Sequence, residues 1–298
     1  MINHKNSSIL GLSLIALLAL SGCNSSDTTN NPDTFVGNPH EVQDDVIAAQ
    51  RAVLASSIVG KDVGAQSPRD IDSSRGSNTK ATITAPASTA MYLCDIHFHK
   101  SAEHKGGQFT TYAGNGDGHG YGGGYKYSGT LTEAELATYA IADEHNPLYS
   151  GDTIETHYVY SSNPSAELGN GLGTCLSGWT EETQPLLRVE TQVYVLVNDE
   201  HALDFEALNH VSKVSGRNQA EHIPSNTGTA IQYEGSTTGP SYNEKVSPLQ
   251  VSWSVRPNIA KVNIETVENW FHHNDFDEHH GHAVRNLVIN LDLLSQIK

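Results

Sequence analysis

The sequence predicts a mainly β domain with a few peripheral helices. Short runs rich in β-branched and aromatic residues recur along the chain, and Gly, Pro, Asn and Ser cluster between them. Stretches with helical spacing are few. Many short strands joined by turns are typical of a mainly β architecture. The five strand candidates are residues 94–99, 153–160, 186–197, 231–240 and 249–255.

Length and charge narrow the classes of function. The 298 residues are 37% hydrophobic, which is enough for a packed core, and they show no internal repeat. The formal net charge is −17, and no group of Lys and Arg residues could neutralise a row of phosphates. We therefore expect no nucleic-acid partner.

The N-terminal residues predict export and a lipid anchor. Lys5 precedes an apolar run over residues 9–20, which is too short to span a bilayer as a helix. The LSGC that follows, ending at Cys23, resembles the lipobox of a bacterial lipoprotein signal peptide. The resemblance implies that residues 1–22 are removed and that Cys23 is lipidated. The chain would then lie in the cell envelope, facing the periplasm or the exterior, with membrane contact through the anchor only. A plain secretory signal is the alternative.

A tether and a helix are expected before the main domain. Residues 23–40 are rich in Ser, Asn, Asp and Thr, which is typical of a flexible tether. Residues 41–60 predict an amphipathic helix that packs on the domain. Its apolar stripe consists of Val42, Val46, Ala49 and Val53, widened by Ile47 and Leu54. The main domain is assigned to residues 61–298, in which residues 131–143 and 204–211 have helical character.

Metal-ligand residue types are concentrated in the first strand candidate. Side chains alternate between the two faces of a strand, so Asp95, His97 and His99 share one face. In the second strand candidate His157 shares a face with Glu155. A catalytic zinc usually takes three protein ligands and keeps a fourth position for water. The spacing therefore predicts a zinc site formed by His97, His99 and His157, although cobalt or cadmium would suit the same ligands.

The same periodicity places a carboxylate beside two of these histidines. Asp95 is two residues from His97, and Glu155 is two residues from His157. Each carboxylate can accept a hydrogen bond from the ring nitrogen that faces away from the metal. Such a bond fixes the tautomer and raises the basicity of the ligand.

The three cysteines predict one disulfide. With Cys23 assigned to the lipid, Cys94 and Cys175 remain as an even pair in an oxidising compartment. On the strand pattern Cys94 points away from His97, so the disulfide would brace the ligand strand from the face opposite the metal. A reduced, buried Cys94 and a nucleophilic Cys175 are the alternatives.

Four separated patches resemble carbonic anhydrases of the alpha-type superfamily, and most of all the delta class. In family order they are QSPRDI at residues 66–71, HFH at 97–99 with Glu103 and His104, ETH at 155–157, and YEGSTTGP at 233–240 followed by Trp253. The ordered set is more specific than any single patch. The resemblance implies a catalytic domain over residues 61–298 with a twisted, largely antiparallel central sheet and peripheral helices.

The resemblance also implies roles for individual residues. The three histidines would be the zinc ligands, with the two carboxylates hydrogen-bonded behind them. Thr238 would accept a hydrogen bond from zinc-bound hydroxide and donate one to Glu103. The residues assigned to the pocket for carbon dioxide are Val159, Thr237 and Trp253, where Thr237 replaces a usually apolar residue.

The implied activity is the reversible hydration of carbon dioxide to bicarbonate and a proton by zinc-bound hydroxide. The family's usual proton-shuttle histidine would lie between the QSP patch and the histidine strand. That interval contains no histidine here, so proton transfer would need another group or the buffer.

Two other classes of function fit part of the pattern. His97-x-His99 followed by Glu103 matches the first half of a cupin metal motif, typical of dioxygenases and isomerases, but the second half is missing at His157. A non-catalytic metal-binding lipoprotein is the other alternative, because the histidine-rich residues 272–282 could hold metal. Gln192 is a weaker candidate ligand. The other histidines expected to be structural or exposed are His104, His145, His201, His210 and His222. The oligomeric state is left open.

Overall fold

The computed structural model describes residues 41–80, 82–144, 146–178, 180, 184–237 and 243–297. All of them belong to one compact unit that covers residues 38–298. The expectations for residues 1–40, including lipidation of Cys23, fall outside the described residues. The same holds for Thr238.

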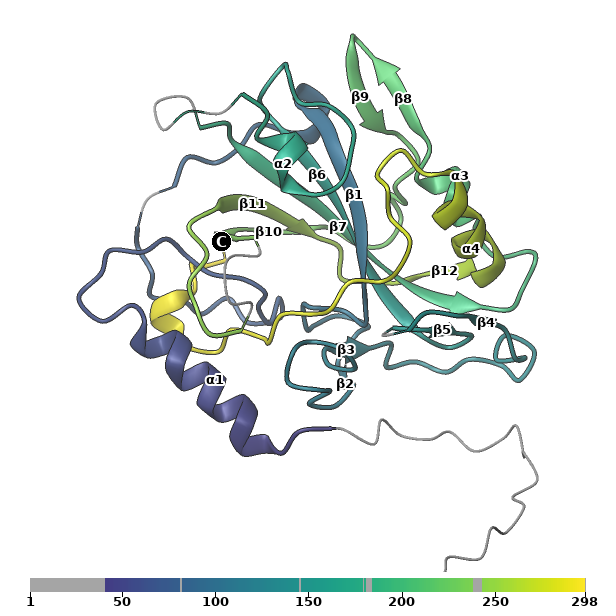
Figure 1. Ribbon diagram of the computed structural model, residues 1–298, viewed down its shortest axis with the longest axis horizontal. Coiled ribbons are helices and arrows are strands. Elements are labelled where there is room, and N and C mark those ends of the chain that lie inside the picture. Colours follow the sequence, from purple (N-terminus) through teal and green to yellow (C-terminus); the bar gives the residue numbers. More distant parts are fainter. Residues whose placement is uncertain are drawn as a thin grey trace, which may run out of the picture. The chain divides into compact units, whose positions relative to one another are not determined.

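A mixed six-stranded sheet forms the centre of the described domain (Figure 1). Its order is β1 (Tyr92–Lys100), β6 (Thr153–Ser161), β7 (Leu187–Val197), β11 (Gln250–Val255) and β10 (Ile231–Ser236), and β12 (Ala260–Asn263) also pairs with β7. The pairs β1–β6, β6–β7 and β10–β11 are antiparallel, whereas β11 and β12 run parallel to β7. The sheet is therefore mainly antiparallel, as predicted.

The two faces of this sheet carry separate hydrophobic clusters. Ile96 and Phe98 of β1 pack on one face against Trp270 of α4 (Ile264–His273). Val159 of β6 packs on the other face, with Val189 of β7. Because both faces are covered, β6 is buried along its whole length. Strand alternation puts the odd-numbered histidines of β1 on the same face as Val159.

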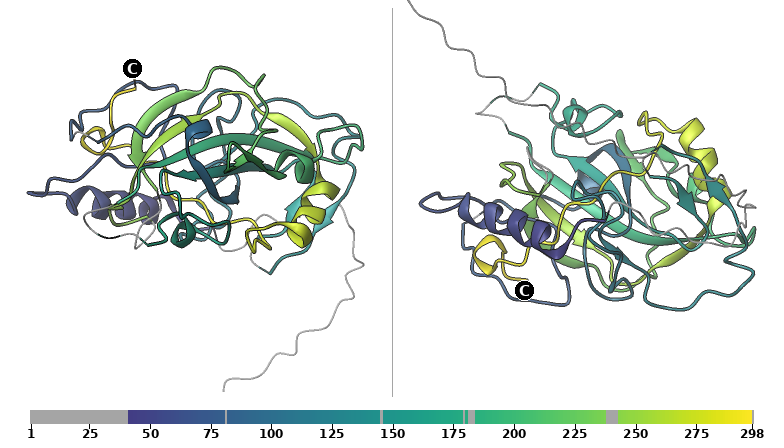
Figure 2. Two further views of the ribbon diagram at one scale, coloured as in Figure 1. Left: turned by 90° about the horizontal axis from the view of Figure 1, so that it is seen from above. Right: turned by 60° about the horizontal axis from the view of Figure 1, so that its bottom comes forward.

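Smaller elements surround the sheet. The short strands are β2 (Thr111–Tyr112), β3 (Tyr125–Lys126), β4 (Ala140–Ile141), β5 (Leu148–Tyr149), β8 (Val211–Val214) and β9 (Arg217–Ala220). The other helices are α1 (Asp44–Ser56), α2 (Leu172–Cys175) and α3 (Phe205–Leu208), with 3-10 turns at Ser88–Ala90 and Leu291–Leu293. The views of Figures 1 and 2 place α1 and the α3–α4 pair at opposite ends of the domain.

All five predicted strand regions contain a strand, but the helix predicted over residues 131–143 is wrong. Thr132 and Glu135 cap a single turn: Thr132 N donates to Glu135 Oε2 (2.8 Å) and Glu135 N donates to Thr132 Oγ1 (3.2 Å). Beyond this turn Asn198 donates to the carbonyl oxygens of Glu135 (2.9 Å) and Ala137 (3.1 Å). These tertiary contacts from the end of β7 take the place of a continued helix and override the local propensity.

The helix α1 packs on the domain, but its inward face differs from the predicted one. Ile47 and Leu54 are buried, whereas Val46 and Val53 are 38% and 49% exposed. Leu54 packs against residues of the C-terminal segment, including Val288. The buried face of α1 therefore contains Ile47 and Leu54, the two residues predicted to widen the stripe.

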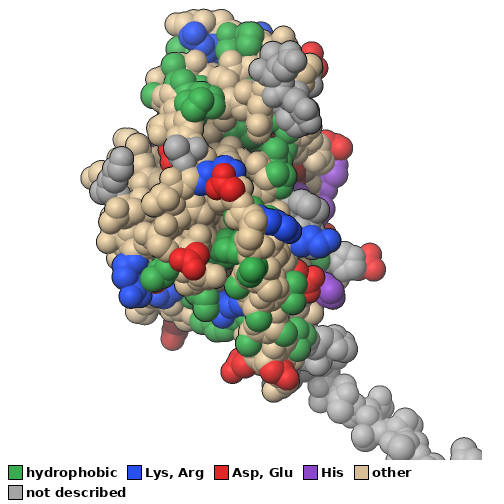
Figure 3. Space-filling view, turned by 90° about the vertical axis from the view of Figure 1, so that its left-hand side faces the viewer, with side chains coloured by type: hydrophobic (Ala, Val, Ile, Leu, Met, Phe, Trp, Pro, Cys, Tyr) green, Lys and Arg blue, Asp and Glu red, His purple; other side chains and the backbone are tan. Residues whose placement is uncertain are grey.

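The face of the molecule drawn in Figure 3 mixes charges of both signs. On this face, Lys and Arg side chains lie in separate small groups among acidic and uncharged atoms (Figure 3).

Of the helices in the described part of the chain, none is both long enough and apolar enough to cross a bilayer.

Candidate metal centre

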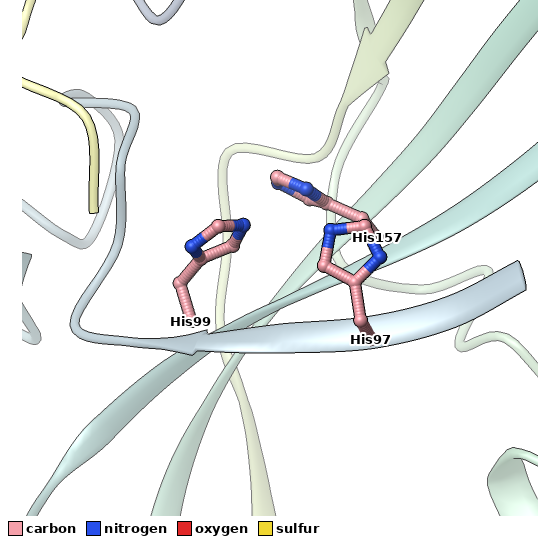
Figure 4. A group of neighbouring side chains, drawn as sticks. All are labelled: His97, His99 and His157. Carbon is pink, nitrogen blue, oxygen red and sulfur yellow. The ribbon is translucent and has the colours of Figure 1, made fainter. Parts of the chain in front are cut away.

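Three histidines converge on the face of the sheet that carries Val159. His97 and His99 come from β1 and His157 comes from β6, where His97 and His157 are direct cross-strand partners. The ring centroids are 5.3 Å (His97 to His99), 5.1 Å (His97 to His157) and 4.8 Å (His99 to His157) apart. One nitrogen from each ring lies within 4.8 Å of the other two, and the rings gather around a common space (Figure 4). One ion with nitrogen ligands at about 2.0–2.1 Å fits this spacing.

Carboxylates hold two of these rings from behind. Nδ1 of His97 lies 2.7 Å from Oδ2 of Asp95, and Nε2 of His157 lies 2.7 Å from Oε1 of Glu155. Both carboxylates are completely buried. Because an ionised carboxylate can only accept, each ring carries its proton on that side. The nitrogens left for a metal are Nε2 of His97 and Nδ1 of His157.

His99 is held by the backbone instead. Its Nδ1 donates to the carbonyl oxygen of Ala283 at 2.7 Å. Its Nε2 is buried and has no hydrogen-bond partner among the described residues. A buried imidazole nitrogen without a partner is costly unless it binds something. Three free nitrogens that face one another fit a borderline divalent ion such as zinc.

Burial keeps two of the rings neutral. It lowers the pKa of His157 to about 4 and the pKa of His99 well below its usual 6.5. Burial acts in the same direction on His97, but the adjacent Asp95 carboxylate, with smaller contributions from Glu278 and Glu103, outweighs it and raises the pKa of His97. A proton therefore competes with a metal at His97 more than at the other two ligands.

Glu155 joins the ligand His157 to a chain of buried polar groups. Its Oε1 accepts from Nδ1 of His104 at 2.6 Å, and its Oε2 accepts from the backbone N–H of the same residue at 3.0 Å. Nε2 of His104 lies 2.7 Å from the hydroxyl of Tyr233, which lies 3.0 Å from Oγ of Ser67. Although burial raises the pKa of Glu155, the two imidazoles lower it by more and hold it well below its usual range. Glu155 is thus a fixed acceptor behind the ligand.

Glu103 lies beside the three histidines. Its Oε1 accepts a hydrogen bond from the backbone N–H of Arg285 at 2.7 Å and lies 3.7 Å from Nδ1 of His99. Burial raises the pKa of Glu103. Its expected partner Thr238 is not among the described residues.

A small cavity next to the metal centre is lined by Glu103 and His157 together with two of the predicted pocket residues, Thr237 and Trp253. The Trp253 ring centroid lies 5.0 Å from that of His157, and its indole N–H donates to the Ser236 carbonyl oxygen at 3.0 Å. The third predicted pocket residue, Val159, is buried in the hydrophobic cluster that contains Trp253.

Cys94 and Cys175 form a disulfide, with 5.2 Å between their Cα atoms, which confirms the predicted pairing. The predicted face is wrong, because Cys94 packs with Val159 on the side of the metal centre. The pairing of β1 with β6 shifts between Leu93 and Asp95. Such an irregularity breaks strict alternation. The disulfide thus ties α2 to the ligand strand on the metal side.

The weaker candidate ligand Gln192 is used elsewhere. Its Nε2 donates to the Asn258 carbonyl oxygen at 3.0 Å, and its Oε1 accepts from the Thr227 hydroxyl at 2.5 Å. The Gln192 amide therefore makes its hydrogen bonds with these neighbours and not with the three converging rings.

Sequence reasoning missed the contribution of the C-terminal segment. The backbone of His282 pairs with β1, since its N–H donates to the Phe98 carbonyl oxygen at 2.8 Å. This pairing brings the Ala283 carbonyl oxygen to His99 and the Arg285 amide to Glu103. Backbone groups carry no residue-specific signal, so no motif could reveal them. For His104 the only signal was its position next to Glu103.

Residues 88–266 match the family model for delta carbonic anhydrase. No curated protein sequence matches the chain. Among solved structures, the alpha-carbonic anhydrase of Photobacterium profundum is similar at 12% identity, over 75% of this chain and 84% of that one, with a TM-score of 0.24. The sulfanilamide complex of the alpha-carbonic anhydrase from Thermovibrio ammonificans is similar at 13% identity, over 82% and 92%, with a TM-score of 0.27. The family match covers more than half of the sequence and includes the three converging histidines, so the chain belongs to the delta carbonic anhydrase family.

Proposed function

We propose that this carbonic anhydrase depends on zinc and hydrates carbon dioxide reversibly to bicarbonate and a proton. Family membership supports the reaction. The observation that carries the zinc dependence is the convergence of three imidazole nitrogens, each on a ring whose other nitrogen is held by an oxygen. Cobalt and cadmium share these ligand preferences, so metal content has to be measured.

Zinc bound there lowers the pKa of a coordinated water to about 7, a value that belongs to carbonic anhydrases in general, and so supplies a nucleophile near neutral pH. The protein's own part is to hold the ligands. Asp95, Glu155 and the Ala283 carbonyl oxygen fix the three tautomers and ring orientations. The lowered pKa of two rings leaves their lone pairs free.

Glu103 and Thr238 are proposed to orient the nucleophile. Glu103 is fixed by the Arg285 amide, and in this proposal it would accept a hydrogen bond from the Thr238 hydroxyl. That hydroxyl can then only accept a hydrogen bond, so it turns a lone pair of the attacking group toward carbon dioxide. Thr237, Trp253 and Val159 are the proposed pocket residues.

The N-terminal sequence supports a location in the cell envelope. Lys5, the apolar run and the lipobox-like LSGC favour removal of residues 1–22 and lipidation of Cys23. Membership of a carbonic anhydrase family speaks against the cupin alternative and against a purely metal-storing lipoprotein.

The His157→Ala variant tests this function. Removing one of three ligands is expected to lower carbon dioxide hydration more than about 100-fold, since even groups behind a ligand alter metal binding by about 10–100-fold. Stopped-flow hydration and elemental analysis measure activity and zinc per chain. His201→Ala is the matched control, because that side chain is 86% exposed. Full activity with a full complement of zinc in His157→Ala would refute the assignment.

A further inference from the structure

A second group of His and Glu side chains lies at the edge of the metal centre. The chain around His282 runs along the outer edge of β1: its N–H donates to the Phe98 carbonyl oxygen at 2.8 Å, and its own carbonyl oxygen accepts from the N–H of Lys100 at 3.1 Å. This pairing fixes the His282 ring 5.3 Å from that of His97, centroid to centroid. His282 is not one of the three converging ligands.

Two other residues whose side chains can bind metals, Glu278 and His280, lie beside His282. Its Nε2 is 2.6 Å from Oε2 of Glu278, a carboxylate that is only 3% exposed. The ring of His280 stacks on that of His282, with 5.3 Å between the centroids and 27° between the planes. His280 is exposed and the His282 side chain is 36% exposed. One buried carboxylate contacts the imidazole of His282, and a second imidazole stacks on that ring from the solvent side.

We propose that Glu278, His280 and His282 form an accessory site for a borderline divalent ion such as zinc, separate from the three-histidine centre. Imidazole nitrogen and carboxylate oxygen are both zinc ligands at about 2.0–2.2 Å. The ion would replace the hydrogen bond between Glu278 and His282, whose hydrogen would leave as a proton to the solvent, and this pair would open by roughly 0.7 Å to reach tetrahedral spacing. Rotation of the exposed His280 ring supplies the third ligand. Water completes the coordination.

The surroundings of this group favour a cation. The chain carries a formal charge of −17. Next to the site, Asp277 is engaged with His279, whose Nε2 lies 3.0 Å from Oδ1 of the aspartate. This neighbouring pair adds negative charge but leaves Glu278, His280 and His282 free to act together. The backbone pairing of His282 with β1 holds the group in place before any ion arrives.

This inference rests on the proposed function in one respect, which is that the three-histidine centre binds the first zinc. Isothermal titration of the full chain, already loaded with one zinc, with further zinc is expected to show a second, weaker equivalent. Glu278→Gln and His280→Ala should each weaken this second equivalent more than about tenfold while the first zinc stays bound. His279→Ala and His273→Ala, both at exposed positions, should leave both equivalents unchanged.

The outcomes separate the two proposals. A loaded wild type that takes up no second ion, or a second ion that persists unchanged in His280→Ala, overturns the accessory site. Dependence of the second ion on His273 or His279 overturns it as well. Failure of the first zinc to depend on His157 instead refutes the proposed metal centre.

Discussion

The three proposed ligand imidazoles differ in the group that lies behind each of them. Asp95 supports His97 and Glu155 supports His157, whereas a neutral backbone carbonyl supports His99. Glu155 already accepts hydrogen bonds from two imidazoles, so its charge is shared, while in the described part of the chain the Asp95 carboxylate contacts the imidazole of His97. His97 is therefore the ligand most exposed to competition from protons.

Zinc affinity is expected to decrease as the pH is lowered, and the pKa of His97 determines where this decrease begins. The pKa of this ring is raised in the folded protein, so below that pKa the metal must displace a proton and affinity drops about tenfold per pH unit. His157, with a pKa of about 4, adds a further loss only near that pH. Chelator competition between pH 8 and pH 5 measures the affinity.

The Asp95→Asn variant tests whether the Asp95 carboxylate raises the pKa of His97. Without the negative charge the pKa of His97 falls, so the bend in affinity against pH should move to lower pH, while affinity at pH 8 falls about 10–100-fold. Glu200→Gln, on a side chain that is 86% exposed, should change neither. An unchanged bend in Asp95→Asn would show that Asp95 does not control the proton on His97.

Much of the site could be predicted from residue spacing. Alternation along a strand is fixed by backbone geometry, so the positions of His97, His99 and Asp95 on one face follow from their numbers alone. The Ala283 carbonyl and Arg285 amide could not be predicted, because every residue offers these groups. The face of Cys94 was mispredicted because the irregular pairing after Leu93 leaves no trace in composition.

At the scale of elements, α1 offers a direct test of which face packs on the domain. Leu54→Ala is expected to destabilise the protein by about 2–5 kcal/mol, because it leaves a cavity against Val288 and Leu293. Val53→Ala, one position earlier on the outer face, should change the free energy of unfolding by less than about 0.5 kcal/mol. Urea unfolding measures both. A larger loss for Val53→Ala than for Leu54→Ala would contradict the packing described here.

Strands were easier to predict than helices in this chain. The runs that became β6 and β7 are rich in β-branched and aromatic residues, and burial on both faces agrees with that preference. The helix predicted at residues 131–143 forms a single turn only, because contacts from Asn198 override the local propensity beyond it. The helix α4 was missed although its signals were present: Asn263 caps it, and Val267, Trp270 and Phe271 form its buried face.

At the scale of the whole molecule, we propose that the N-terminal sequence determines where the enzyme works. The mature chain isolated from a bacterial host is expected to begin at Cys23, to lack residues 1–22 and to carry additional lipid mass. Intact-mass spectrometry measures this. Cys23→Ser should carry no lipid, whereas a Lys5→Gln variant keeps the cysteine and should still be lipidated. A mature chain that begins elsewhere without lipid would refute the anchor.

The order of strands in the sheet cannot be predicted from any single segment of the sequence. β10 and β11 pair as neighbours along the chain, yet β11 then joins β7, more than fifty residues earlier. Periodicity finds such strands but not their partners, because pairing depends on contacts between distant segments. The class of fold was predictable, whereas the parallel pairing of β11 and β12 with β7 was not.

The attachment of the C-terminal segment to β1 means that the proposed metal centre is complete only when synthesis is complete. All three imidazoles have left the ribosome once residue 157 has emerged, but the carbonyl group that aligns His99 and the amide that steadies Glu103 belong to residues 283 and 285. A polypeptide that stops short of them carries ligands without their alignment. If the three imidazoles hold zinc as proposed, prematurely terminated chains are expected to bind it less tightly than the finished enzyme.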